Sequence, residues 1–161
     1  MTSANIGQIV AVDTMILIWG VRKDGDANQR KHAAWLFKGL EDANAQIIVP
    51  SVALAEYLVL VDPQKHADVV APLAKRFIIA PFDVKCAALA ARLFVEGKQD
   101  REMSVQSARN LLKADSLIIA TAAVHGARTF YSDDGRCRKL AERANLSAEA
   151  LPTIAPDLFS Q

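Results

Sequence analysis

The sequence predicts an α/β fold: a three-layer α/β/α sandwich around a mostly parallel central sheet of four or five strands. Short runs of β-branched and other apolar residues recur along the chain, and segments with apolar residues at helical spacing separate them. Such alternation is typical of βαβ units, whose strands are parallel and whose helices cover both faces of the sheet. We found no internal repeat, low-complexity tract or linker, so residues 1–161 are interpreted as a single domain.

In the first part of the chain, each predicted strand is a short apolar run followed by a polar or helix-favouring segment. The predicted elements are, in order, a strand at 8–12, a helical segment at 14–21, a turn at 24–28, a helix at 28–43, a strand at 46–50 and a helix at 51–61. Periodicity alone fits both strand and helix for the last of these. Its alanines, its glutamate and Ser51 near the N-cap favour a helix.

The second part of the chain continues the same alternation. The predicted elements are a helix at 64–76 with a kink or break at Pro72, a strand at 77–83, a helix at 84–97, a loop at 98–110 that enters a helix, a helix at 111–124, a strand at 128–132, a turn and basic helix at 133–145, and a weak last strand after 145. Gly126 is a suitable C-cap for the helix at 111–124.

Composition excludes several classes of protein. The net charge is +1, so no overall field attracts nucleic acid or an anionic membrane, and an RNA-binding role requires a local basic patch. The longest apolar runs are too short to cross a bilayer, and the first residues do not resemble a signal peptide. Cys86 and Cys137 match no metal-binding spacing, which indicates free thiols and a cytoplasmic protein. The histidines are isolated and form no zinc motif.

Acidic residues stand alone in several apolar segments. Asp115 is the only acid in "LLKADSLIIATAAV", Asp13 is the only charge between Gln8 and Val21, and Glu56 is the only charge in the segment 51–61. A fourth acidic feature, Asp133-Asp134, directly follows the predicted strand at 128–132. Because an unpaired buried charge is costly, each of these acids needs a local partner or a site that favours negative charge.

The predicted elements bring these acids toward one place. Asp13 and the Asp133-Asp134 pair follow the carboxyl ends of strands, where open α/β sheets form their ligand crevice. Glu56 and Asp115 lie on helices able to line that crevice. Asp115 shares a helical stripe with Leu111, Ile118 and Ala122, which predicts an inward-facing position.

Each acid also has a structural interpretation, and the sequence leaves it open. Asp13 is a suitable cap for the helix that follows it, and Asp115 is a suitable N-cap for a helix that begins there. Glu56 fits the solvent face of a half-exposed helix. Asp133-Asp134-Gly135 fits a simple turn, because Asp and Gly are common in turns.

If the acids share a pocket, they need a cation. Neighbouring carboxylates raise one another's pKa unless positive charge is supplied, and within the three apolar segments Lys113, next to Asp115, is the only basic residue in a suitable place. A set of oxygen ligands without His or Cys indicates a hard ion, Mg²⁺ or Mn²⁺. Such ions commonly act on phosphate esters.

The acids and their neighbours resemble the PIN domain family, and within it the ribonuclease toxins of bacterial toxin–antitoxin pairs, the VapC-like group. The similar segments are "VDTMILI", "SVALAEYL" and "KADSLIIATAAVHGARTFYSDD", and together they span Val12 to about Leu140. In that family a strand ends in Asp followed by Ser or Thr, a Glu lies on the helix after strand two, an Asp opens a helix of small residues, and a T-x-D/N turn follows the last motif strand. Two departures are Ser132 in place of the usual Thr, and "GRCRKL" where Asp-Phe often follows.

The resemblance implies a metal-dependent endoribonuclease. Asp13, Glu56, Asp115 and Asp134 would hold one or two Mg²⁺ or Mn²⁺ ions, with Asp133 as the alternative fourth ligand. A metal-bound water would attack the phosphodiester in line and leave a 5′-phosphate and a 3′-hydroxyl. Thr14 and Ser132 would orient a carboxylate or the water through their hydroxyls, or serve only as a helix cap and a turn residue.

An RNA substrate must be held by basic side chains, because phosphate contacts dominate nucleic-acid affinity. The candidates follow the last acidic turn or lie near Asp115; they are Arg136, Arg138, Lys139, Arg143, Arg109 and Lys113. A solvated helix face explains the same residues equally well. The resemblance also implies two protein partners, a cognate antitoxin and a second copy of the chain, with the helices at 28–43 and 51–61 as docking surfaces.

Other functions fit the sequence less well. A phosphatase of the haloacid dehalogenase type requires a second Asp at position 15, where this chain has Met. A phosphorylation receiver needs an acidic pair by the first strand, and only Asp13 is present. Both Gly-rich phosphate-binding motifs are missing. The alternative that stays open is a PIN-like binding module without catalysis, which acts in an RNA or protein complex.

Overall fold

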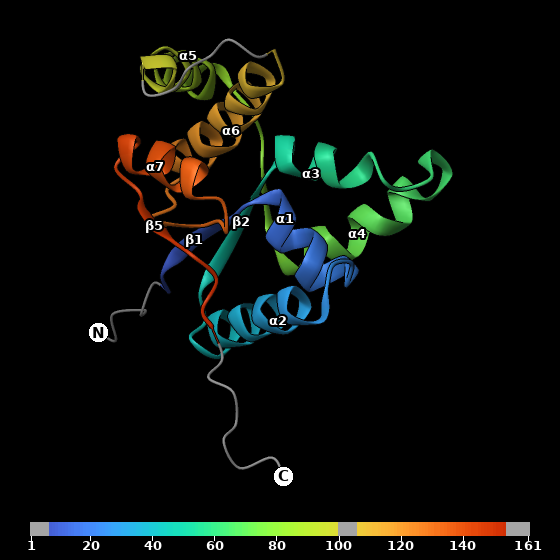
Figure 1. The fold of residues 1–161 in the computed structure, drawn as a ribbon. Coiled ribbons are helices and arrows are strands. Elements are labelled where there is room, and N and C mark those ends of the chain that lie inside the picture. Colours follow the sequence, from blue (N-terminus) through green and yellow to red (C-terminus); the bar gives the residue numbers. More distant parts are fainter. Residues whose placement is uncertain (1–6, 100–105, 154–161) are drawn as a thin grey trace, which may run out of the picture.

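The structure is a computed structural model that describes residues 7–99 and 106–153 (Figure 1). Its strands are β1 (Ile9–Val12), β2 (Gln46–Pro50), β3 (Ile78–Ala80), β4 (Thr129–Tyr131) and β5 (Ser147–Glu149). They form one sheet in the order β3-β2-β1-β4-β5, and all neighbouring strands are parallel. The predicted α/β class and parallel sheet are therefore confirmed.

Helices connect the strands and cover both faces of the sheet. They are α1 (Thr14–Leu17), the π-helix η1 (Ile18–Arg22), α2 (Ala27–Asp42), α3 (Ser51–Leu58), the 3₁₀ turn η2 (Pro63–Lys65), α4 (His66–Arg76), α5 (Val84–Gln99), α6 (Gln106–Val124) and α7 (Gly135–Arg143). Figure 1 shows α5, α6 and α7 on one side of the sheet and α1 and α2 on the other. In the described ranges, no helix is both long and apolar enough to cross a membrane.

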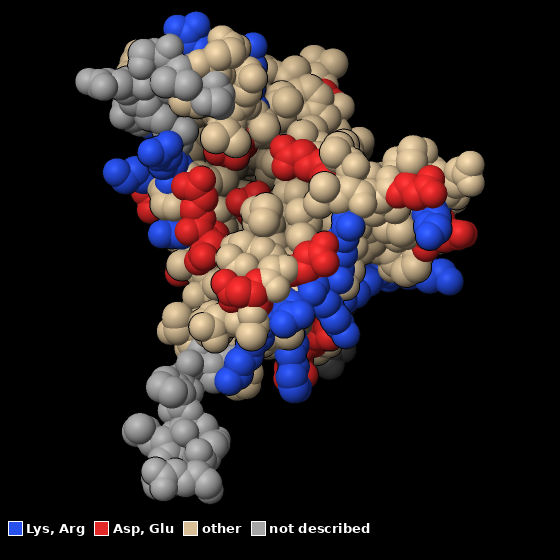
Figure 2. All heavy atoms as spheres, turned by 45° about the vertical axis from the view of Figure 1, so that its right-hand side comes forward, with Lys and Arg blue, Asp and Glu red and all other residues tan. Residues whose placement is uncertain are grey.

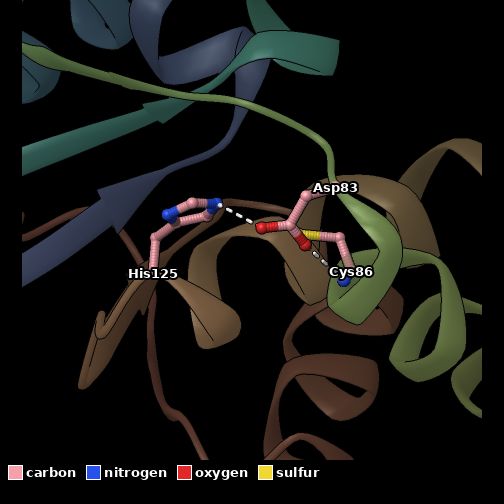
Figure 3. A group of neighbouring side chains, drawn as sticks. All are labelled: Asp83, Cys86 and His125. Carbon is pink, nitrogen blue, oxygen red and sulfur yellow. Dashed lines mark hydrogen bonds and ion pairs between the residues drawn. The ribbon is translucent and has the colours of Figure 1, made fainter.

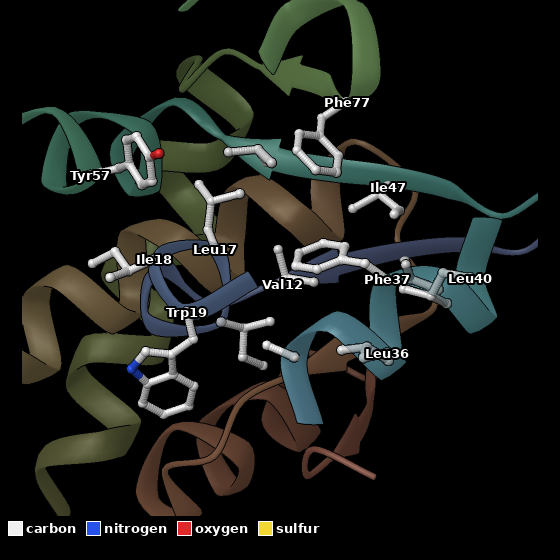
Figure 4. Packing of buried hydrophobic residues seen from close by; sticks show 14 of the residues in the cluster. Val12, Leu17, Ile18, Trp19, Leu36, Phe37, Leu40, Ile47, Tyr57 and Phe77 are labelled. Atoms are coloured by element: carbon white, nitrogen blue, oxygen red, sulfur yellow. The ribbon is translucent and has the colours of Figure 1, made fainter. Parts of the chain in front are cut away.

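Alternating side chains of the strands feed two separate cores, as the period of a β-strand requires. Val10 and Val12 of β1 pack into the core beneath α1, α2 and α4, where Phe37 and Phe77 lie with their ring centroids 5.6 Å apart (Figure 4). Ala11 between them faces the opposite core, which α5, α6 and α7 cover. Both faces of β1 are thus buried, which explains why its sequence is apolar throughout.

Two predicted boundaries were wrong. The helix expected at 111–124 begins earlier, at Gln106, because the polar residues Gln106, Arg109 and Asn110 are exposed on α6 and are compatible with a helix. The segment around Pro72 forms no break: Pro72 lies inside α4. Its side chain is exposed, so water can bond the carbonyl group that its missing N–H leaves unpaired.

Candidate acidic active site

The sheet order places three of the acid-bearing segments side by side. β1 lies between β2 and β4, and all three strands point the same way. Asp13 follows β1, the Ser132–Asp134 turn follows β4, and α3, which carries Glu56, follows β2 without a gap. The Asp13 amide donates a hydrogen bond to the Tyr131 carbonyl at 2.9 Å, which joins the first two segments directly. The acids therefore gather at the carboxyl edge of the sheet.

Both carboxylate oxygens of Asp13 accept hydrogen bonds. Oδ1 accepts from the Thr14 amide at 2.7 Å, so Asp13 does cap α1, as the structural interpretation expected. Oδ2 accepts from the Ser132 hydroxyl at 2.8 Å. The same Ser132 oxygen accepts from the Asp134 amide at 3.2 Å, and the Ser132 side chain is fully buried. Ser132 thus fixes Asp13 and the turn after β4 relative to each other.

Thr14 holds the second acid. Its hydroxyl donates to Glu56 Oε2 at 2.8 Å, and Thr14 itself is only 4% exposed. Glu56 is half-buried, so its interpretation as a solvent-facing helix residue was wrong. The reason is the packing of α3 against α1, which the sequence could not show. Thr14 and Ser132 lie where the resemblance placed them, each donating its hydroxyl hydrogen to an acid of the site.

Asp115 lies well inside α6, so it is not the N-cap of that helix, and the capping interpretation was wrong. Its stripe partners Ile118 and Ala122 are buried, but Leu111 is 60% exposed. The buried neighbour one turn earlier is Leu112 instead. Asp115 is half-buried at the boundary between the core and the surface.

Electrostatics link the acids to one another. Burial raises the pKa of Asp13, the hydrogen bonds from Ser132 and Thr14 oppose that rise, and the charges of Glu56 and Asp134 add to it. Burial also raises the pKa of Cys137, and the charges of Asp13, Asp115 and Asp134 contribute. Through its charge, each of the four acids therefore affects the pKa of Asp13, of Cys137 or of both. Figure 2 shows Asp and Glu side chains gathered around the middle of this face, with Lys and Arg farther out.

Asp134 fits the fourth acidic position better than Asp133. Both acids are exposed, but the charge of Asp134 acts on Asp13 and Cys137, whereas Asp133 contributes to neither pKa shift. Asp134 is also the N-cap of α7, because Oδ1 accepts from the Arg136 amide at 2.8 Å. The backbone at Asp133-Asp134 thus forms a turn, as the structural interpretation expected. The hydrogen bond that caps α7 also orients the Asp134 carboxylate.

The candidate RNA-binding residues divide into two groups. Arg138 donates from Nη1 to the Ser132 carbonyl at 2.8 Å, and Arg143 lies 3.8 Å from Glu96, so both side chains already have structural contacts. Lys113 lies over the Phe94 ring at 5.8 Å but is exposed. Arg136, Lys139 and Arg109 are exposed as well.

Sequence reasoning missed Cys137 at this site, and it gave Arg138 only an RNA-binding role. Cys137 lies buried next to the acids, and Arg138 braces the turn that carries Ser132. One signal for Cys137 was available. It shares the buried stripe of α7 with Leu140 and Ala141, and it comes one helical turn after Asp134. No sequence signal distinguishes Arg138 from the other basic residues of α7.

Comparisons with known proteins agree with this fold. The model of the PIN domain matches residues 10–143. A search of curated proteins gave no match. Similar solved structures include VapBC2 from Rickettsia felis bound to a DNA fragment from their promoter, with 21% identity, a TM-score of 0.59, and 90% of this chain and 100% of that chain covered.

Two further solved structures have the same fold. FitAcB from Neisseria gonorrhoeae has 20% identity and a TM-score of 0.54, covering 86% of this chain and 95% of that chain. DNA-bound VapBC from Salmonella typhimurium has 15% identity and a TM-score of 0.60, covering 90% of this chain and 99% of that chain. At these identities the likeness to the solved structures concerns the fold alone. The family match, in contrast, covers most of the sequence, at residues 10–143. This chain therefore belongs to the PIN domain family.

Proposed function

We propose that this protein is a metal-dependent endoribonuclease that acts as the toxin of a toxin–antitoxin pair. The observation that carries the proposal is the chain of hydrogen bonds through Thr14 and Ser132 that links Glu56, Asp13 and the Asp134 turn. Asp115 lies near enough for its charge to act on Cys137, as the charges of Asp13 and Asp134 do. Membership in the PIN domain family, whose members are generally nucleases, supports the same function.

The residues of the site fit a divalent cation. The pKa of Asp13 stays raised although two hydrogen bonds stabilise its carboxylate, chiefly because burial disfavours the charged form and also because Glu56 and Asp134 are negative; a bound cation would offset both effects. All four candidate ligands are carboxylates, the donors that Mg²⁺ and Mn²⁺ prefer. Asp13, Glu56, Asp115 and Asp134 would hold the ion. When bound, it would make a water molecule more acidic and offset the charge that develops on the phosphodiester.

The protein's own contribution is to position its carboxylates before substrate arrives. Ser132 uses one buried hydroxyl to fix Asp13, and Thr14 does the same for Glu56. Arg138 of α7 holds the carbonyl of Ser132 and braces the turn that carries Asp134, and the hydrogen bond from Ser132 to Asp13 ties that turn to the end of β1. Partners of this kind typically change metal affinity or activity 10–100-fold.

Exposed basic residues near the acids would hold the RNA backbone. Arg136 and Lys139 lie on α7, directly after the turn with Asp134, and Arg109 and Lys113 lie on α6 before Asp115. Phosphate contacts from such residues are independent of sequence. Because Arg138 contacts the Ser132 carbonyl and Arg143 lies near Glu96, we assign these two mainly to the structure of the protein. The four exposed residues Arg136, Lys139, Arg109 and Lys113 are the proposed contacts for the substrate.

The toxin assignment rests on the solved structures, because VapBC and FitAB are toxin–antitoxin complexes. We propose an antitoxin and a second copy of the chain as partners. Large apolar side chains are exposed on the two helices expected to dock partners: Trp35 on α2 is 54% exposed, and Val59 and Leu60 after α3 are 80% and 56% exposed. Exposed apolar groups of this kind are typical of protein interfaces.

The test is cleavage of a structured RNA by metal-free protein before and after addition of Mg²⁺ or Mn²⁺. We expect cleavage only with metal, and 5′-phosphate ends on the products. Asp115→Asn should lose both cleavage and calorimetric metal binding, whereas Asp42→Asn, which changes an exposed acid paired with Lys38, should keep both. If the wild-type protein binds RNA but does not bind metal and does not cut the RNA, it is instead the non-catalytic binding module.

A further inference from the structure

A second group of potential metal ligands lies outside the acidic site. Asp83 precedes α5, Cys86 lies in the first turn of that helix, and His125 follows the last residue of α6. Figure 3 shows the three side chains pointing toward one another. One ligand atom from each lies within 4.8 Å of the other two, and no other trio of His, Cys, Asp or Glu within residues 7–99 and 106–153 meets that limit.

Nearby contacts orient these groups. The Asp83 Oδ1 atom accepts from the Cys86 amide at 3.0 Å, and Asp83 Oδ2 lies 3.8 Å from His125 Nε2. The Pro81 carbonyl oxygen lies 2.8 Å from His125 Nε2 and 3.8 Å from Cys86 Sγ. A carbonyl, a carboxylate and a sulfur atom thus surround one imidazole nitrogen. Such an arrangement of acceptors favours a proton or a cation at their centre.

We propose that Asp83, Cys86 and His125 form a binding site for a borderline transition-metal ion such as Zn²⁺, distinct from the acidic site. Around a tetrahedral zinc ion, with bonds of about 2.0–2.3 Å, ligand atoms lie about 3.3–3.8 Å apart. The distance of 3.8 Å between Asp83 Oδ2 and His125 Nε2 lies at the upper end of that range. Asp83 is exposed, so its carboxylate can move the remaining distance without disturbing the core.

The donor set selects a different ion from the one that the acidic site would take. A thiolate and an imidazole favour zinc-like ions over Mg²⁺, whereas four carboxylates favour Mg²⁺ or Mn²⁺. The charges also balance, because one carboxylate and one thiolate neutralise a divalent ion. Burial raises the pKa of the Cys86 thiol, so without metal it is protonated and a poor nucleophile. Binding of the ion would displace that proton.

The surroundings leave space for a fourth ligand. A surface cavity of about 470 Å³ adjoins the cluster, and its walls come from Asp83, Val84, Lys85, Val124 and His125. Water in that cavity can complete a tetrahedral coordination, as in zinc sites with three protein ligands.

The ion would join two points that are distant in the sequence. α5 and α6 pack against each other, and the cluster connects the beginning of α5 to the end of α6. Because the site forms only when these ends meet, metal binding is coupled to the folded state and stabilises it. The site therefore braces the helix that carries Asp115, without contributing a ligand to the acidic crevice.

Cobalt substitution tests the proposal in the full-length protein. Co²⁺ bound to a thiolate gives an intense near-ultraviolet charge-transfer band that oxygen ligands do not give. We expect that band in the wild type and in Cys137→Ala, its loss in Cys86→Ala, and displacement of Co²⁺ by Zn²⁺. Asp83→Asn and His125→Gln should weaken Zn²⁺ binding at least about 100-fold, since even partners outside the ligand set cost 10–100-fold.

Stability gives a second measurement that does not depend on Cys86→Ala folding well. Zn²⁺ at about a hundredfold excess over its Kd should raise the Tm of the wild type by about 5–10 °C. The same Zn²⁺ concentration should leave the Tm of Asp83→Asn unchanged. The proposal is wrong if no thiolate band appears, or if the band survives Cys86→Ala and disappears in Cys137→Ala. The latter result would place the metal-binding thiol next to the acidic crevice.

Discussion

The acidic crevice and the Asp83–Cys86–His125 cluster are assembled in different ways. The crevice collects side chains that follow three neighbouring parallel strands, so the sheet itself brings Asp13, Glu56 and Asp134 together. The cluster depends on the packing of one helix end against another. A site at strand ends is fixed by hydrogen-bonded register, whereas a site between helices is fixed by side-chain packing.

The two regions also differ in how they stabilise a carboxylate. In the crevice, the acids act on one another, and the pKa of Asp13 is raised. In the cluster, the amide hydrogen bond from Cys86 lowers the pKa of Asp83, and the charge of His125 contributes in the same direction. The charged form of Asp13 is disfavoured by burial and by its acidic neighbours, whereas that of Asp83 is already stabilised. The comparison predicts opposite responses to charge removal, and the predictions below test it.

The largest effect is expected at the turn after β4. Asp134→Asn should reduce metal-dependent RNA cleavage by about 100-fold or more, because it removes a candidate metal ligand whose stabilisation of the transition state is worth several kcal/mol. Asn is also a good N-cap, so α7 should remain intact. Asp133→Asn, measured in the same single-turnover assay, should stay within about threefold of the wild type. Equal losses in both variants would show that the two acids share the role.

A smaller but clear effect is expected when a positioning hydroxyl is removed. Ser132→Ala should lower cleavage about 10–100-fold, because Asp13 loses the hydrogen bond at 2.8 Å that orients it. Ser116→Ala is the matched control, since Ser116 is also buried but donates to the Leu112 carbonyl within α6. Rates at saturating Mn²⁺ separate poor metal binding from poor catalysis. Activity retained by Ser132→Ala would remove Ser132 from the site.

Removing the charge of Asp13 should stabilise the metal-free protein at neutral pH. The folded-state pKa of Asp13 is raised above 3.8, so its contribution to stability is present below that pH and is lost as the pH rises through the raised value. Asp13→Asn avoids this loss. In urea unfolding with EDTA from pH 3 to pH 8, the free energy of unfolding of Asp13→Asn should exceed that of the wild type above about pH 4. Saturating Mg²⁺ should then stabilise the wild type but not the variant.

Asp83→Asn should give the opposite sign in the same experiment. The pKa of Asp83 is lowered, so its contribution to stability is present above 3.8 and is lost as the pH falls through the lowered value. The variant should therefore be slightly less stable than the wild type at pH 7 and equal to it in acid. A stabilised Asp83→Asn would contradict the contrast between the two regions.

The smallest effect concerns the RNA-binding residues. Arg136→Gln and Lys139→Gln should each reduce the slope of log affinity against log salt concentration by about 0.7–0.9, as expected for one lost phosphate contact. Arg143→Gln should change the slope less, because Arg143 Nη1 lies 3.8 Å from Glu96 Oε2 and this carboxylate already offsets part of its charge. If all three variants keep the wild-type slope, the basic residues of α7 form only a solvated face and do not bind RNA.

Much of this protein could be predicted from its sequence because the signals were local. The run at 8–12 followed by Asp13 specifies a buried strand and an acid at its end, and the alternation of strands and helices specifies a parallel sheet. The boundary of α6 was predicted poorly, because polar residues at 106–110 fit a helix surface as well as a loop. Local preference is weak where only one side of a helix is buried.

The sequence by itself determined the fold class, the PIN domain resemblance and the candidate acids, because short-range patterns of apolar and charged residues encode all three. Only the tertiary structure decided that Glu56 meets Thr14, that Arg138 supports Ser132, and that His125 reaches Asp83 and Cys86. These contacts join residues on different helices or strand ends. Their formation depends on how the elements pack, and packing depends on the summed shape of many side chains rather than on any local motif.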